Sequence, residues 1–333
     1  MTILVLQVNW STRPNAPKSA QIPSKTELRS MVTGGSGFIG SHLCRRLCEA
    51  GSEVHATSRQ RRLGAEGESP IWWQADLANL NDARRVFAAV RPDIVFHLAG
   101  SVGASPDIEL VLPTYHSLLT STVNVLLAAT ECGCRRIVLT ASLTEPAFSE
   151  AEPTPHSPYA AAKWAACGYG RMFQNLYGTP LVILRPFMVY GPAQAPSKLI
   201  PSVTLSLLRG EAPKLGSGKT KADWVYITDV IEAFMRAAVA SGIEGRTIDL
   251  GSGKLISIRG IVDRLVEATG SHIEPVFCAL SDRPGENAIA ANTAVAFELL
   301  EWKATTPLET GLHQTVEWFK AGAMDGNARM FRH

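Results

Sequence analysis

A glycine-rich turn between a short apolar strand and an amphipathic helix constrains this chain more than any other feature. The turn spans Thr33–Gly40 and reads TGGSGFIG. Gly34 permits a tight bend, Gly37 lets a pyrophosphate approach the backbone, and Gly40 lets the helix pack on the strand. The free amides and the positive dipole end of the helix N-terminus attract phosphate. We therefore expect a dinucleotide site here, in preference to a purely structural bend.

Short apolar strands alternate with amphipathic helices up to about residue 186, which predicts a Rossmann-type, doubly wound α/β fold with a parallel sheet. After that point prolines and glycines break the rhythm, and shorter helices follow. We expect a smaller mixed α/β lobe that closes over the carboxyl edge of the sheet, where ligands bind. The predicted division is a flexible extension at 1–27, a dinucleotide-binding domain at 28–186 and a substrate lobe at 187–333, with chain exchange between the last two left open.

The composition is that of an ordinary globular protein, with 46% hydrophobic and 19% charged residues in 333. The net charge of +2 argues against a nucleic-acid binder that works by bulk electrostatics. The chain has no run of about 18 uninterrupted apolar residues, so we expect no membrane span. Its six cysteines lack the paired spacing of a zinc site, which predicts free thiols, no metal and a cytoplasmic location.

The end of the second strand bears on the choice of cofactor. A carboxylate at this place binds the adenosine ribose of NAD, but the chain reads Thr57, Ser58 and Arg59 here. Arg59 is suited to pair with a 2′-phosphate, so we expect NADP(H) in preference to NAD(H). The alternative is a solvated basic loop, which also includes Arg61 and Arg62.

Asp76 follows a short predicted strand at 71–74 and precedes a predicted helix at 79–90. Its carboxylate can accept a hydrogen bond from the adenine amine of a bound cofactor, or it can cap the helix. The position slightly favours the cofactor role.

Tyr159 and Lys163 lie four residues apart in a predicted helix, so both project from one face. The ammonium favours the phenolate, which can then exchange protons near neutral pH. Ser142 closes a buried strand at the ligand edge, where its hydroxyl can bind a substrate oxygen and share a proton with Tyr159. Thr140 and Thr144 are alternatives to this serine, and turn capping is its structural explanation.

These segments together resemble the extended short-chain dehydrogenase/reductase family of nucleotide-sugar epimerases, dehydratases and ketoreductases. The resemblance runs from about Leu28 to Trp318. The matching segments are the TGxxGFIG turn at 33–40, an HLAA-like strand end at 97–100, the YxxxK pair at 159–163, an LRPFNVYGP-like run at 184–192, an RDW(I/V)YVDDV-like stretch at 223–230 and an RPGD-like loop at 283–286.

The resemblance implies roles for individual residues. Tyr159 transfers the proton, Lys163 holds the nicotinamide ribose, and Ser142 orients the substrate oxygen. The implied cofactor contacts are Gly34, Gly37, Phe38, Ile39, Gly40, Ser58, Arg59, Asp76, Leu77, Leu98, Ala99, Tyr159 and Lys163. The implied nucleotide-sugar contacts are Ser142, Met188, Lys198, Leu199 and Arg283. A homodimer through the helices at 113–132 and 158–177 is also implied, although their small residues equally suit packing on the sheet.

Departures from the family pattern narrow the reaction. Leu143 and Thr144 stand where sugar 4,6-dehydratases carry Asp-Glu, which disfavours dehydration, and Met188 replaces an asparagine that contacts the sugar-nucleotide phosphate. The first interpretation is reduction of a 4-keto (deoxy)sugar nucleotide by NADPH, with Tyr159 as proton donor. The alternative is a C4 epimerase that works through a transient ketone with retained NAD(P). A catalytically silent binding protein is disfavoured because Ser142, Tyr159 and Lys163 are all present.

Overall fold

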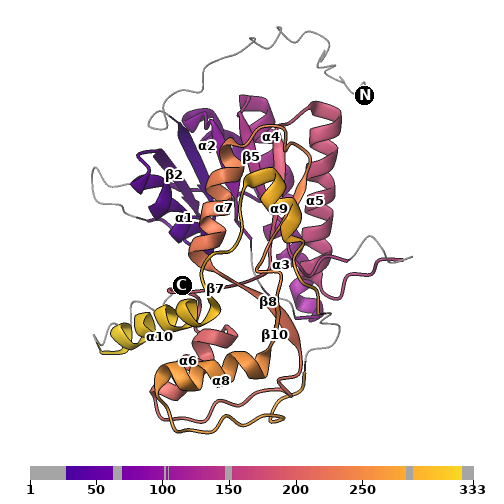
Figure 1. The fold of residues 1–333 in the computed structure, drawn as a ribbon. Coiled ribbons are helices and arrows are strands. Elements are labelled where there is room, and N and C mark those ends of the chain that lie inside the picture. Colours follow the sequence, from indigo (N-terminus) through magenta and orange to yellow (C-terminus); the bar gives the residue numbers. More distant parts are fainter. Residues whose placement is uncertain are drawn as a thin grey trace, which may run out of the picture.

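The computed structural model describes residues 28–62, 70–100, 103, 105–146, 152–282 and 288–324. The predicted extension at 1–27 and Arg283 lie outside the described residues. The chain builds a large α/β body with a smaller lobe beside the carboxyl ends of its strands (Figure 1). This arrangement agrees with the predicted fold class.

The large sheet has seven strands in the order β3-β2-β1-β4-β5-β6-β9, and every neighbouring pair is parallel. The strands are β1 (Arg29–Thr33), β2 (Glu53–Ser58), β3 (Ile71–Gln74), β4 (Ile94–His97), β5 (Arg136–Thr140), β6 (Leu181–Pro186) and β9 (Thr247–Leu250). The helices that cover it are α1 (Phe38–Glu49), α2 (Leu80–Val90), α4 (Ser121–Cys132), α5 (Pro158–Tyr177) and α7 (Ile227–Val239).

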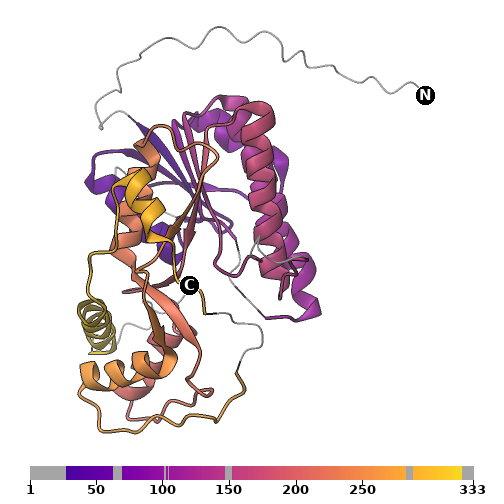
Figure 2. The ribbon, with the colours of Figure 1, turned by 45° about the vertical axis from the view of Figure 1, so that its right-hand side comes forward.

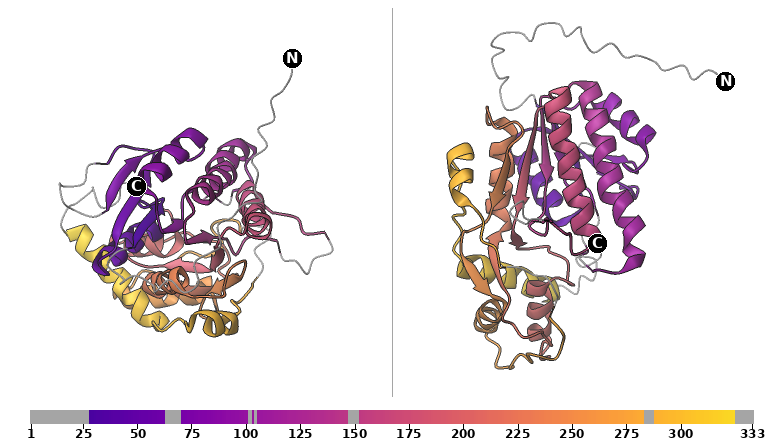
Figure 3. Two further views of the ribbon diagram at one scale, coloured as in Figure 1. Left: turned by 90° about the horizontal axis from the view of Figure 1, so that it is seen from above. Right: turned by 90° about the vertical axis from the view of Figure 1, so that its right-hand side faces the viewer.

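Alternating strand residues feed two separate cores. Val32 and Phe96 pack in a core with α1 and α7, whereas Met31 and Val95 pack in a core with α2, α4 and α5. Figure 2 and the right-hand view of Figure 3 show helices on both sides of the sheet. Because both faces are covered, the strand interiors are mostly apolar, and most polar residues lie at the strand ends.

The smaller lobe is built around a three-stranded sheet in the order β10-β8-β7. Its strands are β7 (Met188–Tyr190), β8 (Lys221–Tyr226) and β10 (Leu255–Ser257), with β7 and β8 parallel and β10 antiparallel to β8. The remaining helices of the C-terminal half are α6 (Leu199–Leu208), α8 (Ile258–Thr269), α9 (Thr293–Leu300) and α10 (Leu308–Met324).

The chain crosses between the two bodies more than once. After β7 and β8 in the small lobe, α7 returns to the large sheet and β9 pairs in parallel with β6, with Ile183 opposite Thr247. The seventh strand of the dinucleotide-binding body therefore comes from beyond residue 186.

The helical stretch Ile108–Cys132 contains η2 (Ile108–Leu110), α3 (Val111–Thr114), the π-helical turn η3 (Tyr115–Thr120) and α4. By length and composition alone this stretch is long and apolar enough to cross a membrane, with a mean hydropathy of 1.2. Its second half covers the sheet, where Val125, Leu126 and Ala129 are buried. A core helix passes the same test, so the composition carries no membrane assignment.

Candidate active site

The glycine turn leads directly from β1 into α1. Gly34 has a φ of 69°, in the left-handed region, and its carbonyl accepts a hydrogen bond of 2.9 Å from the Gly37 N–H. A Cβ added at Gly34 would lie 2.8 Å from the Cα of Ala99. Gly37 caps α1 without a side-chain hydrogen bond, and the first turn holds no acidic residue. The exposed helix amides and the lack of a Cβ at both glycines fit the pyrophosphate of a dinucleotide.

A buried histidine joins this turn to the neighbouring strand and helix. Thr122 Oγ1 donates to the Leu118 carbonyl at 2.5 Å, so it accepts from His97 Nε2 at 2.9 Å. His97 Nδ1 is then an acceptor, and the Thr33 hydroxyl donates to it at 2.8 Å. Thr33 Oγ1 in turn accepts from the backbone N–H of Leu98 and of Ala99, each at 3.2 Å. This chain of bonds fixes the β4 end against Gly34.

His97 is fully buried and neutral in the folded protein. Burial, and then the charge of Lys163, lowers the pKa of His97 from 6.5 to about 3. In the unfolded chain the His97 imidazole takes up a proton as the pH falls through about 6.5. In the folded protein it binds that proton only at about pH 3. This folded pKa is depressed, so His97 destabilises the fold increasingly as the pH falls through that window.

We expect replacement of His97 by glutamine to reduce the loss of folding free energy that occurs as the pH falls below about 6.5. Each pH unit below 6.5 costs the wild type about 1.4 kcal/mol at this site. Denaturant unfolding at pH 7 and pH 5 should show a loss about 2 kcal/mol smaller in His97→Gln than in the wild type. Equal losses in the two proteins would place the acid sensitivity elsewhere.

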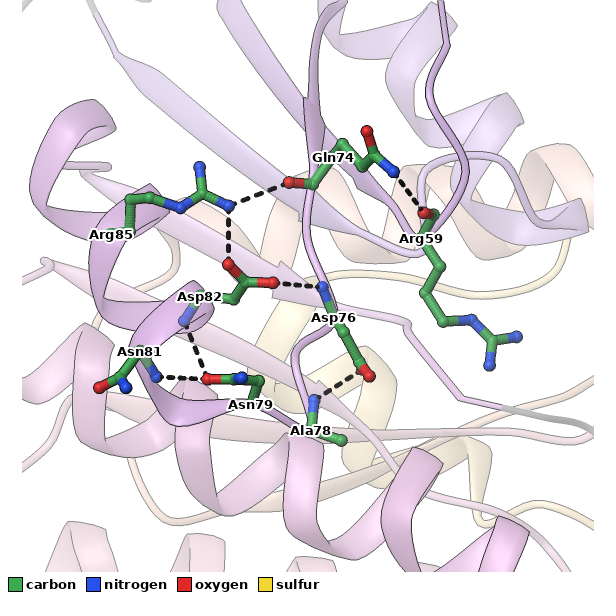
Figure 4. Close-up of polar contacts among 8 residues, drawn as sticks. All are labelled: Arg59, Gln74, Asp76, Ala78, Asn79, Asn81, Asp82 and Arg85. Carbon is green, nitrogen blue, oxygen red and sulfur yellow. Dashed lines mark hydrogen bonds and ion pairs between the residues drawn. The ribbon is translucent and has the colours of Figure 1, made fainter.

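The proposed adenosine end of the site lies where β2 and β3 finish (Figure 4). The Arg59 carbonyl accepts from Gln74 Nε2 at 3.2 Å, and the exposed Arg59 guanidinium points away from the Asp82–Arg85 ion pair. The N-cap of α2 is Asn79, whose side chain accepts from two backbone amides, so Asp76 is not the helix cap. Asp76 instead accepts from the Ala78 N–H at 3.0 Å and stays exposed.

Tyr159, Lys163 and Ser142 lie on two elements that meet at the carboxyl edge of the sheet. Helix α5 starts with Pro158 and is capped by the Ser157 hydroxyl, which places Tyr159 in the first turn. Lys163 Nζ donates to the Thr140 carbonyl at 2.9 Å, two residues before Ser142. The three side chains are nearly buried, and Tyr159 packs in a small cluster with Leu118 from the π-helical turn.

Ser142 is held in a tight turn. Its Oγ accepts from the Thr144 N–H at 3.2 Å and lies 2.9 Å from Thr144 Oγ1. The Ser142 N–H donates to Glu145 Oε1 at 2.8 Å, a contact that the sequence reasoning missed. The S-x-x-E spacing of 142–145 matches a capping box and was the available signal.

The predicted substrate contacts lie in or near the smaller lobe. Met188 opens β7 and is exposed, Lys198 is the N-cap of α6, and Leu199 is the first residue of that helix. Leu77 is buried behind the cofactor region, where its carbonyl accepts from Asn124 Nδ2 at 2.9 Å. Phe38 and Ile39 start α1, as predicted from the glycine turn.

Comparisons with known proteins identify the family of this chain. The model of the NAD dependent epimerase/dehydratase family matches residues 30–251. A UDP-glucose 4-epimerase of Mycolicibacterium smegmatis is 31% identical over 88% of this chain and 99% of that protein. The dTDP-glucose 4,6-dehydratase 1 of Escherichia coli K12 is 27% identical over 88% of this chain and 92% of that protein.

Solved structures of similar proteins share this fold. The UDP-glucose 4-epimerase of Thermotoga maritima, solved with UDP-glucose, has a TM-score of 0.80 at 26% identity and covers 89% of this chain and 100% of its own. The Thermus thermophilus UDP-glucose 4-epimerase, in complex with NAD, has a TM-score of 0.77 at 28% identity and covers 88% and 99%.

The chain belongs to the NAD-dependent epimerase/dehydratase family, a branch of the extended short-chain dehydrogenases/reductases. The predicted family and fold class are thereby confirmed. The individual site roles and the preference for NADP stay predictions.

Proposed function

We propose that this protein is a nucleotide-sugar 4-epimerase that uses a retained pyridine nucleotide. The bond between Lys163 Nζ and the Thr140 carbonyl carries the proposal, because it joins the helix of Tyr159 to the strand that leads to Ser142. The near-complete coverage of a UDP-glucose 4-epimerase at 31% identity supports epimerisation as the reaction and a UDP-hexose as the substrate class.

In this reaction the bound nicotinamide supplies reversible hydride exchange with the sugar carbon. The Tyr159 phenolate takes the proton of the sugar 4-hydroxyl and later returns it to the same oxygen. The Lys163 ammonium holds the nicotinamide ribose, and the Ser142 hydroxyl holds the sugar oxygen by a hydrogen bond. The C4–H bond breaks and re-forms on the opposite face of the ring, so the overall reaction is neutral in electrons and protons.

Dehydration is disfavoured by the side chains that follow Ser142. Leu143 is apolar, and the Thr144 hydroxyl bonds Ser142. The nearby carboxylate, Glu145, is buried and accepts from the Ser142 N–H. It therefore does not replace the acid and base that removal of water from the sugar requires.

Purified protein supplied with UDP-glucose tests the proposal. We expect UDP-galactose to accumulate to an equilibrium mixture without net oxidation or reduction of added cofactor. Stoichiometric oxidation of NADPH with an NDP-4-keto-6-deoxyhexose, and no isomerisation of UDP-glucose, would contradict epimerisation.

The second candidate is an NADPH-dependent ketoreductase, and Arg59 is the observation that favours it. Its exposed guanidinium follows Ser58 at the end of β2, where no carboxylate stands to repel a 2′-phosphate. We expect Arg59→Ala to weaken NADP(H) binding about 10-fold and to leave NAD(H) binding nearly unchanged. Titration of both cofactors checks this. Arg62→Ala is the matched control, because Arg62 is stacked over Trp72. Equal losses for the two cofactors would contradict a 2′-phosphate role.

A homodimer through α3, α4 and α5 is part of the proposal. The left- and right-hand views of Figure 3 show these helices along one side of the molecule. Exposed apolar side chains here include Val111 and Leu112 of α3 and Tyr115 of η3, and Ala161 and Ala165 line an open hollow beside Tyr115. Such a surface suits a close helix–helix contact with a second copy. Sedimentation should then give twice the chain mass.

A further inference from the structure

Glu145 is a buried carboxylate with no role in the reaction described above. Only 9% of its surface is exposed, and its Oε1 accepts from the Ser142 N–H at 2.8 Å. The Glu145 N–H donates back to the Ser142 carbonyl at 3.2 Å. Burial of a carboxylate destabilises the folded protein unless hydrogen bonds compensate it. The bond from the Ser142 N–H is therefore a specific contact that Glu145 needs in order to stay buried.

The pair makes the glutamate half of a capping box but does not start a helix, and the Ser142 hydroxyl accepts from the Thr144 N–H instead of the Glu145 N–H. In a capping box the glutamate side chain accepts from the N–H of the serine three residues before it, as Glu145 does with Ser142. The described residues that follow, 146 and 152–157, are not helical, and α5 has its own cap in Ser157. The contact therefore stabilises the turn that carries Ser142.

Glu145 also links this turn to the helix of Tyr159 and Lys163. Cys167 Sγ on α5 donates to Glu145 Oε1 at 3.4 Å, one helical turn after Lys163. Burial and the charge of Glu145 raise the pKa of the Cys167 thiol, so it stays a donor. Together with the bond from Lys163 to the Thr140 carbonyl, this gives α5 two attachments to the end of β5, one on each side of Ser142.

The turn leaves the Ser142 hydroxyl free to act. Its oxygen already accepts from the Thr144 N–H, and its hydrogen has one neighbouring acceptor in Thr144 Oγ1 at 2.9 Å. A substrate oxygen can replace that acceptor without any movement of the backbone. Through its bond to the Ser142 N–H, Glu145 contacts the backbone of Ser142 and not its hydroxyl.

We propose that Glu145 is a positioning residue that fixes the backbone of Ser142 relative to Tyr159 and Lys163. This inference rests on the proposed catalytic role of Ser142. The hydrogen-bond acceptor at Oε1, rather than the negative charge, is the required property, because an amide oxygen at the same place accepts from the same N–H, although more weakly than a carboxylate does.

Comparison of Glu145→Leu with Glu145→Gln shows whether catalysis requires the hydrogen-bond acceptor or the negative charge. We expect Glu145→Leu to lower kcat about 10-fold with little change in KM, because a small misplacement of a catalytic group lowers turnover more than binding. Glu145→Gln keeps an acceptor and should retain kcat within about 3-fold. In a Ser142→Ala background, Glu145→Leu should lower kcat less than about 2-fold, since its effect passes through Ser142.

Three results would overturn the proposal: an unchanged kcat in Glu145→Leu, an equal loss in Glu145→Gln, or an equal fold loss with and without Ser142. A general loss of folding would act in both backgrounds, so the cycle distinguishes it. Should Glu145→Leu not fold, Glu145→Asp takes its place, since the shorter carboxylate cannot reach the same N–H and should lower kcat about 3-fold or more. Failure of the proposed function would show in the wild type, which would not turn over UDP-glucose.

Discussion

Replacement of Tyr159 by phenylalanine is expected to lower kcat about 10²-fold or more while leaving KM and cofactor binding nearly unchanged. The substitution removes only the phenolic oxygen, which is the group that we propose exchanges the proton with the sugar hydroxyl. The ring still fills its place beside Leu118 and Ala162, so the helix start should keep its packing. Steady-state assays with UDP-glucose measure the loss.

Tyr169→Phe is the matched control, because Tyr169 lies on the same helix and is exposed. It should keep wild-type activity. If Tyr159→Phe retained more than about a tenth of the wild-type kcat, Tyr159 would not be the proton-transfer residue.

Replacement of Lys163 by methionine has the second largest expected effect. Methionine fills a similar volume but carries no ammonium, so it can neither donate to the Thr140 carbonyl nor hold the nicotinamide ribose. We expect kcat to fall about 10²-fold. Loss of the bond to the Thr140 carbonyl should also lower the free energy of unfolding by about 1 kcal/mol.

Steady-state rates, alongside denaturant unfolding, check both effects. Lys320→Met is the control, since Lys320 pairs with Glu317 on the surface of α10. A Lys163→Met protein that kept more than about a tenth of the wild-type kcat would contradict the proposed role of Lys163.

Local patterns predicted the elements that carry the site. The strand, glycine turn and helix near the start of the described chain, and the helix at 158–177, lie where the pattern of apolar residues places them. The pairing of strands that lie far apart in the sequence could not be predicted from local patterns. The return of β9 to β6 joins residues 64 positions apart, as Ile183 and Thr247 show, and no local pattern encodes that partner.

The same limit applies within the site. Ser142, Tyr159 and Lys163 stand out because their side-chain types suggest chemistry, whereas Glu145 contacts a backbone N–H and is marked in the sequence only by the S-x-x-E spacing of 142–145. The tautomer of His97 depends on Thr122, which donates to a carbonyl inside the helical stretch. The helix cap, which the sequence offered as the less favoured role of Asp76, belongs to Asn79, because α2 starts one residue after Asn79.

A crystal structure of the protein with NAD and UDP-glucose tests the central claim most directly. The account predicts the pyrophosphate of NAD at the glycine turn, Gly34–Gly40. It also predicts the sugar 4-oxygen within about 3 Å of both the Tyr159 phenolic oxygen and Ser142 Oγ. A sugar bound with its 4-oxygen away from these two groups, or NAD bound outside the glycine turn, would contradict it.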